Sequence, residues 1–145
     1  MSKEDEELRK AVTEVRLMEG SANLLQSRLN IVSAALEETN IATRALEGAK
    51  DCPKGTEVLV PVGGGSFLRM ELADVEKAIV GVGAGACIEK TIESSIQDLK
   101  DRQAELEKVS ESLQQQLGQI LTSIDSSRDR LSRLVEKQSG SQPQD

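Results

Sequence analysis

Two long stretches of the chain carry apolar residues at alternating spacings of three and four. In the first, residues 8–46, these residues fill the a and d positions of an unbroken heptad repeat. Sustained heptads are typical of a coiled coil rather than of one face of a globular helix. Ser2 and Asp5 have the spacing of a helix N-cap and Gly48 is placed to follow a last turn, so we predict a helix over residues 1–48. The a and d positions are Leu8, Ala11, Val15, Met18, Ala22, Leu25, Leu29, Val32, Leu36, Thr39, Thr43 and Leu46.

The second stretch, residues 92–134, repeats the pattern and predicts a helix over residues 92–137. After it the periodicity is lost, and residues 138–145 are expected to form a disordered tail. The a and d positions here are Ile92, Ile96, Leu99, Gln103, Leu106, Ser110, Leu113, Leu117, Ile120, Ile124, Ser127, Leu131 and Leu134.

The two heptad runs have nearly equal length and a compact segment joins them, which favours an antiparallel pair. In such a pair an a position of one helix shares a layer with a d position of the other, and one register satisfies this throughout. It places Leu25 in the same layer as Leu117. It also places Thr39 opposite Gln103, and two polar residues that meet in an apolar seam often specify the register.

Residues 49–91 between the helices predict β-structure. Four short apolar or alternating runs are separated by turn residues, and the first two flank three consecutive glycines. The runs are TEVLVPV (56–62), SFLRMEL (66–72), KAIVGVG (77–83) and ACIEKT (86–91). The fold class predicted is therefore α+β, a long antiparallel two-helix coiled coil with two central β-hairpins.

One glycine motif raises an alternative. Gly81, Gly83 and Ala86 follow an apolar run and fit G-x-G-x-x-G/A, the dinucleotide-binding fingerprint. A Rossmann site needs these glycines to open a helix that crosses over to a second buried parallel strand. Here the following helix carries coiled-coil heptads and then a polar tail, so the glycines are interpreted as bends and close approaches between strands.

Composition narrows the function classes. The net charge is −7, His, Trp and Tyr are absent, and Phe67 is the one aromatic residue. The absence of His removes the commonest general base and metal ligand. The negative net charge and the near absence of aromatic residues disfavour a nucleic-acid-binding surface. We expect no enzyme activity, no cofactor, no metal, no nucleic-acid partner and no membrane association. Cys52 and Cys87 lack C-x-x-C spacing and are expected to be free thiols in a cytoplasmic protein.

The central strands cannot bury a core unaided, because they are short, hold one aromatic residue and leave unpaired edges. We therefore expect them to assemble with strands of other chains into an intersubunit β-barrel. The apolar strand residues that are candidates for this assembly are Val58, Val60, Val62, Leu68, Met70, Leu72, Ile79, Val80, Val82 and Ile88.

Two segments, EVLVPVGGGSFLRMEL and AIVGVGAGACIEKTIESSIQDLK, resemble the prefoldin family, and specifically its archaeal α type. The resemblance is strongest over residues 56–100, and the flanking heptads agree with the family's architecture. Gly64 is one departure, at a position where the family usually has Ala.

The resemblance implies a hexamer of two α and four β prefoldin subunits, built on a double β-barrel from which six coiled coils extend. It further implies an ATP-independent holdase that captures non-native polypeptides at the coil tips and delivers them to a group II chaperonin. A passive coiled-coil scaffold or tether is the alternative, because heptad periodicity alone does not separate the two functions.

If clients bind at the tips, the candidates are apolar residues near both ends of the chain. Val12 and Val135 lie at e positions beside the seam and offer apolar surface without opening it. Core packing is the competing interpretation for the a and d members of the set. The candidates are Leu8, Ala11, Val12, Val15, Leu131, Leu134 and Val135.

Overall fold

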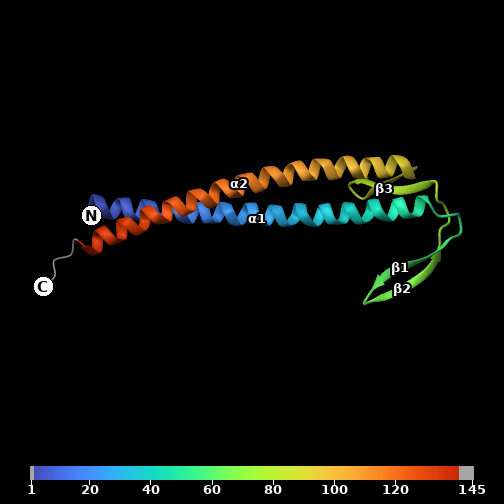
Figure 1. Cartoon of the computed structure of the whole chain (residues 1–145), viewed down its shortest axis with the longest axis horizontal. Coiled ribbons are helices and arrows are strands. Elements are labelled where there is room, and N and C mark those ends of the chain that lie inside the picture. The colour runs from blue at the N-terminus through green and yellow to red at the C-terminus, as the bar shows by residue number, and fades with distance from the viewer. Residues whose placement is uncertain (1, 141–145) are drawn as a thin grey trace. The chain divides into compact units, whose positions relative to one another are not determined.

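The computed structural model describes residues 2–140 as two long helices and four strands (Figure 1). The predicted α+β class, with two consecutive hairpins between two long helices, is confirmed. The elements are α1 (Lys3–Lys50), β1 (Glu57–Gly63), β2 (Ser66–Glu71), β3 (Lys77–Gly83), β4 (Ala86–Thr91) and α2 (Ile92–Gly140).

The start of α1 is as predicted, but its end is not. The Ser2 hydroxyl accepts a hydrogen bond from the Asp5 backbone N–H at 3.3 Å, as an N-cap does. The helix continues past Gly48 to Lys50, so the predicted end at residue 48 is wrong. A glycine inside a helix costs only about 1 kcal/mol. The restriction that Pro53 imposes on the residue before it provides the stronger stop.

The α2 helix begins at a well-defined cap. The Thr91 hydroxyl accepts a hydrogen bond from the Ser94 N–H at 3.1 Å. At its other end α2 extends to Gly140, so residues 138–140 of the expected disordered tail are helical. There the Gln138 side chain donates to Asp5 of α1 at 3.1 Å, a tertiary contact that periodicity alone does not reveal. The rest of that predicted tail, residues 141–145, lies outside the described residues.

The chain divides into two compact units, described here one at a time. The helical unit pairs α1 as far as Ser33 with α2 from Lys108 onward, in opposite directions. The hairpin unit, Ala34–Glu107, holds the remaining parts of both helices and all four strands. In both units every predicted a and d position is buried or half-buried, which confirms the two heptad assignments.

Two buried threonines in the hairpin unit show how the seam accommodates polar residues. The Thr39 hydroxyl donates to the Ala35 carbonyl at 2.7 Å, and the Thr43 hydroxyl donates to the Thr39 carbonyl at 2.9 Å. Both side chains are 6% exposed. Because the hydroxyls are satisfied within α1, their burial carries no unpaired donor.

The two hairpins are copies of one another at a spacing of twenty residues. The pair Glu57–Glu71 at the base of the first hairpin corresponds to Lys77–Thr91 in the second, and each later pair corresponds in the same way. Each hairpin also has a register shift beside its turn, at corresponding positions. The hairpins nevertheless form separate two-stranded sheets.

Candidate functional site

The glycine motif lies in a hairpin and not at a helix N-terminus. Gly81 is in β3, and the turn to β4 runs through Gly83, Ala84 and Gly85 with φ angles of 103°, 52° and 76°. The corresponding turn of the first hairpin, over residues 63–65, has φ angles of 104°, 58° and 74°. These are left-handed conformations that glycine adopts readily, so the motif serves a chain reversal.

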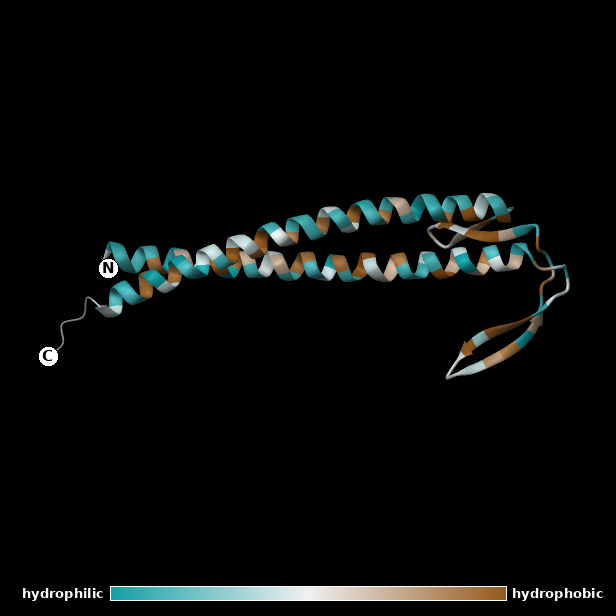
Figure 2. Cartoon of the chain, viewed as in Figure 1, coloured by the Kyte–Doolittle hydropathy of each residue, from teal (hydrophilic) through white to brown (hydrophobic). Residues whose placement is uncertain are grey.

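The strands of the hairpins are rich in apolar residues, drawn brown in Figure 2, and many of these side chains are exposed to solvent. Ile79 is 78% exposed and Val62 is 56% exposed. Four of the predicted assembly residues, Val58, Val60, Leu72 and Val80, are half-buried, and the other predicted assembly residues are exposed. A two-stranded hairpin with this much exposed apolar surface is not independently stable in water.

Two large exposed side chains of the first hairpin were missing from the assembly candidates. Leu59 and Phe67 are 63% and 58% exposed. They lie on the face of the hairpin opposite Val58 and Val60, because neighbouring residues along a strand point to opposite faces. The signal was present in the sequence, since residues 58–62 are apolar at consecutive positions.

The predicted tip residues fall into three groups by burial. Ala11 and Val15 are buried in the seam between the helices, as core packing requires. Leu8, Val12, Leu131 and Leu134 are half-buried. Val135 is 49% exposed, which is the largest exposed fraction among the predicted tip residues.

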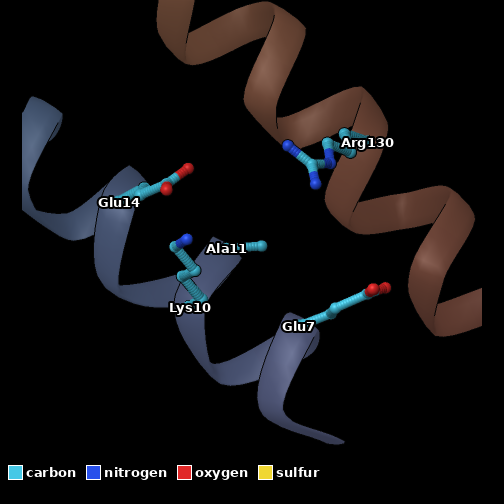
Figure 3. A pocket seen from close by; sticks show the side chains of 5 residues that line it. All are labelled: Glu7, Lys10, Ala11, Glu14 and Arg130. Carbon is cyan, nitrogen blue, oxygen red and sulfur yellow. The ribbon is translucent and has the colours of Figure 1, made fainter. Parts of the chain in front are cut away.

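Charged residues line a hollow beside this seam. A pocket of about 210 Å³ is lined by Glu7, Lys10, Ala11, Glu14 and Arg130. Figure 3 shows the Arg130 side chain projecting from α2 towards the α1 residues. The flank of the tip on this side is therefore lined mainly by charged side chains.

A further apolar row lies on α1 away from the seam. Leu17, Leu24 and Ile31 are 67%, 54% and 69% exposed. They are spaced by seven residues, which places them at successive c positions on one face of the helix. We call these three residues the outer row. The heptad pattern contained this signal, at c positions rather than at the a and d positions that predict the seam.

Ion pairs between the helices agree with the predicted register. Arg128 donates to Glu19 at 2.5 Å in the helical unit, and Lys100 lies 3.3 Å from Glu47 in the hairpin unit. All four residues occupy e positions, and both pairs are neighbours when Leu25 and Leu117 share a layer. Hydrogen bonding to the Glu19 carboxylate raises the pKa of Arg128.

The second hairpin packs on the start of α2. Lys90 of β4 forms an ion pair with Asp98 of α2. Val80 and Val82 of β3 line an open pocket together with α2 residues. One face of this hairpin thus lies beside α2, although Val82 is still 55% exposed, and the opposite face carries the exposed Ile79.

Other candidate chemistry is sparse in the described part of the chain. Cys52 and Cys87 are free thiols, as predicted. Among residues 2–140, His, Cys, Asp and Glu side chains form no group of three or more that could hold a metal ion. Over the same residues, neither helix has an apolar stretch of the length needed to cross a lipid bilayer.

Comparison with known proteins places these features in a family. A sequence model for prefoldin subunits matches residues 18–137. Prefoldin subunit alpha of Methanopyrus kandleri is 33% identical over 77% of this chain and 71% of its own length. The corresponding subunit of Methanococcoides burtonii is 33% identical over 84% of this chain and 91% of its own length.

Solved structures show the same fold. Filamentous PFD from Methanocaldococcus jannaschii superposes with a TM-score of 0.65 at 22% identity, covering 77% of this chain and 93% of that one. The prefoldin beta subunit from Thermococcus strain KS-1 superposes with a TM-score of 0.57 at 14% identity, covering 95% of each chain.

Proposed function

We propose that this chain, which belongs to the prefoldin family, is a chaperone subunit that holds non-native polypeptides without using ATP. The observation that carries this proposal is the exposed apolar surface of its helices. The outer row and Val135 expose large apolar side chains on elements whose seam is already filled. Contacts of this kind are weak and non-directional, which suits a binder that accepts many sequences.

We extend the predicted client surface from the tip to the outer row. Ala11 and Val15 are buried in the seam, so they can reach a client only when the end of the helix pair frays. Leu17, Leu24 and Ile31 need no such opening. We therefore propose two client surfaces, the outer row at c positions and Val12 with Val135 at e positions beside the seam.

The hairpins are proposed to assemble the complex. Their apolar residues on both faces and their free strand edges require burial by other chains. Prefoldin β subunits are the partners proposed, in a hexamer of two α and four β subunits built around an intersubunit β-barrel. Delivery of clients to a group II chaperonin in the cytoplasm completes the proposal.

The experiment measures suppression of aggregation of a chemically unfolded protein, with the chain assembled with a prefoldin β subunit and no nucleotide added. The test variant replaces Leu17, Leu24 and Ile31 with Ser. Burying the exposed part of each side chain against a client is worth about 1 kcal/mol, so the three together contribute roughly 3 kcal/mol. We expect client affinity to fall at least about tenfold.

Ile41→Ser is the matched control, because Ile41 is also exposed, at 59%, but lies outside the outer row. It should leave client affinity within about twofold. Equal affinity for the triple variant and the unchanged chain would refute the outer row as a client surface.

A second variant addresses the tip and the alternative function. Removal of residues 1–15 and 128–145 shortens both helices at their free ends and leaves every strand intact. We expect normal assembly and a partial loss of aggregation suppression. Several coiled coils of the complex bind one client together, and only those of this chain are shortened. If the complex with the unshortened chain assembles but does not suppress the aggregation of any client, the result would instead favour the alternative function, a passive coiled-coil scaffold.

A further inference from the structure

The outer row is part of a second heptad pattern on α1. Each of its three large side chains lies four residues after a small residue at an f position. All six residues are exposed, so no other element of the described chain covers them. They follow one another at spacings of four and three, which is the pattern that packs one helix against another. We call these six residues the outer face: Thr13, Leu17, Gly20, Leu24, Ser27 and Ile31.

Charged residues end the outer face on both sides. The c position before Leu17 is Lys10, and the c position after Ile31 is Glu38. The pattern therefore extends over residues 13–31, about 28 Å along the helix at roughly 1.5 Å per residue. Two helices that meet over this length bury less surface than a permanent complex needs, so a contact here is reversible.

The outer face is complementary to itself when two copies of α1 meet in opposite directions. In an antiparallel pair the c positions of one helix share layers with the f positions of the other, as a and d positions do in the seam. One register sets every large side chain opposite a small one, which fills the space between the helices evenly. Its layers join Leu17 with Ser27, Leu24 with Gly20 and Ile31 with Thr13, each twice about a two-fold axis. The Thr13 hydroxyl donates to the Arg9 carbonyl at 2.9 Å, so its burial leaves no unpaired donor.

Charged residues beside the outer face select the same register. Glu14 and Arg28 lie at g positions, which flank these layers, and both are exposed. In this register Glu14 of each copy lies beside Arg28 of the other, so an ion pair forms twice. Neither residue forms an ion pair with the described residues of its own chain. Opposite charges placed in this way hold one register and disfavour others.

The neighbouring registers are less favourable. A shift by one heptad in one direction sets Arg28 beside Arg28 of the other copy, where like charges repel. A shift in the other direction sets Ile31 opposite the charged Glu6, which is costly in an apolar layer. Packing and charge therefore agree on one register.

We propose that the outer face of α1 docks on the outer face of a second copy of this chain, as an antiparallel helix pair that Glu14 and Arg28 select. The docked pair covers the outer row and is a resting state of the chain. Clients displace the second copy because they bind the same three large side chains. This competition rests on the proposed function of the outer row, whereas the docking itself does not.

Cross-linking through one new cysteine tests the pairing and its register. The chain carries Cys52→Ser and Cys87→Ser and is assembled with a cysteine-free prefoldin β subunit. Asn23→Cys places a thiol close to the two-fold axis, so a short bismaleimide should link two copies of the chain. Asn30→Cys is the matched control, because position 30 of one copy lies about 20 Å along the helix from position 30 of the other. We expect at least about tenfold more of the linked pair from position 23.

Two charge reversals in the Asn23→Cys chain test the selection. Glu14→Arg and Arg28→Glu each set like charges together twice and should lower the yield of linked pairs at least about fivefold. In an equimolar mixture, a mixed pair of the two variants again joins opposite charges at both contacts. A mass tag on one variant identifies these mixed pairs, whose yield should return to within about twofold of that without reversals. Arg44→Glu, an exposed reversal outside the outer face, should leave the yield within about twofold, and circular dichroism checks that each variant keeps its helices.

Three results would overturn the docking. Position 23 could give no linked pair, positions 23 and 30 could give equal yields, as a parallel pair would, or the mixture of reversals could be no better than either variant alone. Addition of a chemically unfolded client should lower the yield of linked pairs at least about twofold. A yield that the client leaves unchanged would refute the resting state. Aggregation suppression by the triple Ser variant tests the client surface separately, so the two failures are distinguished.

Discussion

The register of the helix pair can be tested with a disulfide across one layer. Leu25 is 7% exposed and Leu117 is half-buried, and the neighbouring ion pairs place them in the same layer. We replace both with Cys in a background where Cys52 and Cys87 are Ser. Residues that share a seam layer lie within the range that a disulfide spans, so oxidation should give an intrachain bond.

The expected stability follows from two opposing terms. Closing a loop of about ninety residues stabilises the folded chain by roughly 4.5 kcal/mol through the loss of unfolded-state entropy. Shortening two seam leucines to cysteine costs about 1 to 2 kcal/mol each through lost burial. The reduced variant should therefore be less stable than the unchanged chain by roughly 2 to 4 kcal/mol, and the oxidised form should equal or exceed it.

Gel mobility and mass before and after reduction detect the bond, and urea denaturation of both forms measures the free energy of unfolding. The matched control pairs position 25 with position 124, one heptad away. If the control forms the intrachain bond and the pair 25–117 does not, the register is wrong. Absence of the bond in both would contradict the side-by-side arrangement of these segments.

Three further predictions concern the hairpin unit. Val60→Asp places an ion among the apolar strand residues of the first hairpin and should abolish assembly with a prefoldin β subunit; sedimentation that still shows full-size complexes would contradict the barrel. Ala84 has a φ of 52°, so Ala84→Gly should stabilise the second hairpin by about 1 kcal/mol and slow its amide exchange about fivefold. The first hairpin already has a glycine, Gly64, at the corresponding position, so its amide exchange serves as the unchanged reference. The hydrogen bond from the Glu76 N–H lowers the pKa of Asp74. The ionised Asp74 carboxylate should therefore stabilise the turn fully above the ordinary pKa of 3.8, and this stabilisation should be lost as the pH falls through the lower pKa that Asp74 has in the folded chain. Nuclear magnetic resonance of the Glu76 amide measures this titration, and a midpoint equal to that of an unstructured Asp would contradict it.

The heptads and the alternating runs determined most of the elements. Hydrophobic periodicity is a local property, and each heptad position from Leu8 to Leu134 was assigned to the seam without knowledge of the fold. The third and fourth strands were predicted with the bounds that the structure has. The bounds of α1 and α2 were less accurate, because α1 continues past Gly48 until Pro53 stops it and α2 continues to where Gln138 contacts Asp5.

The surfaces were decided by the tertiary structure. Periodicity identifies residues that are able to pack, but only the placement of the neighbouring elements shows which of them remain uncovered. Val15 became core, while Leu17, two residues away, became exposed surface. Strand register likewise put Glu57 opposite Glu71, fourteen residues later in the chain. Burial and cross-strand pairing depend on contacts between residues distant in sequence, and such contacts are a property of the folded chain.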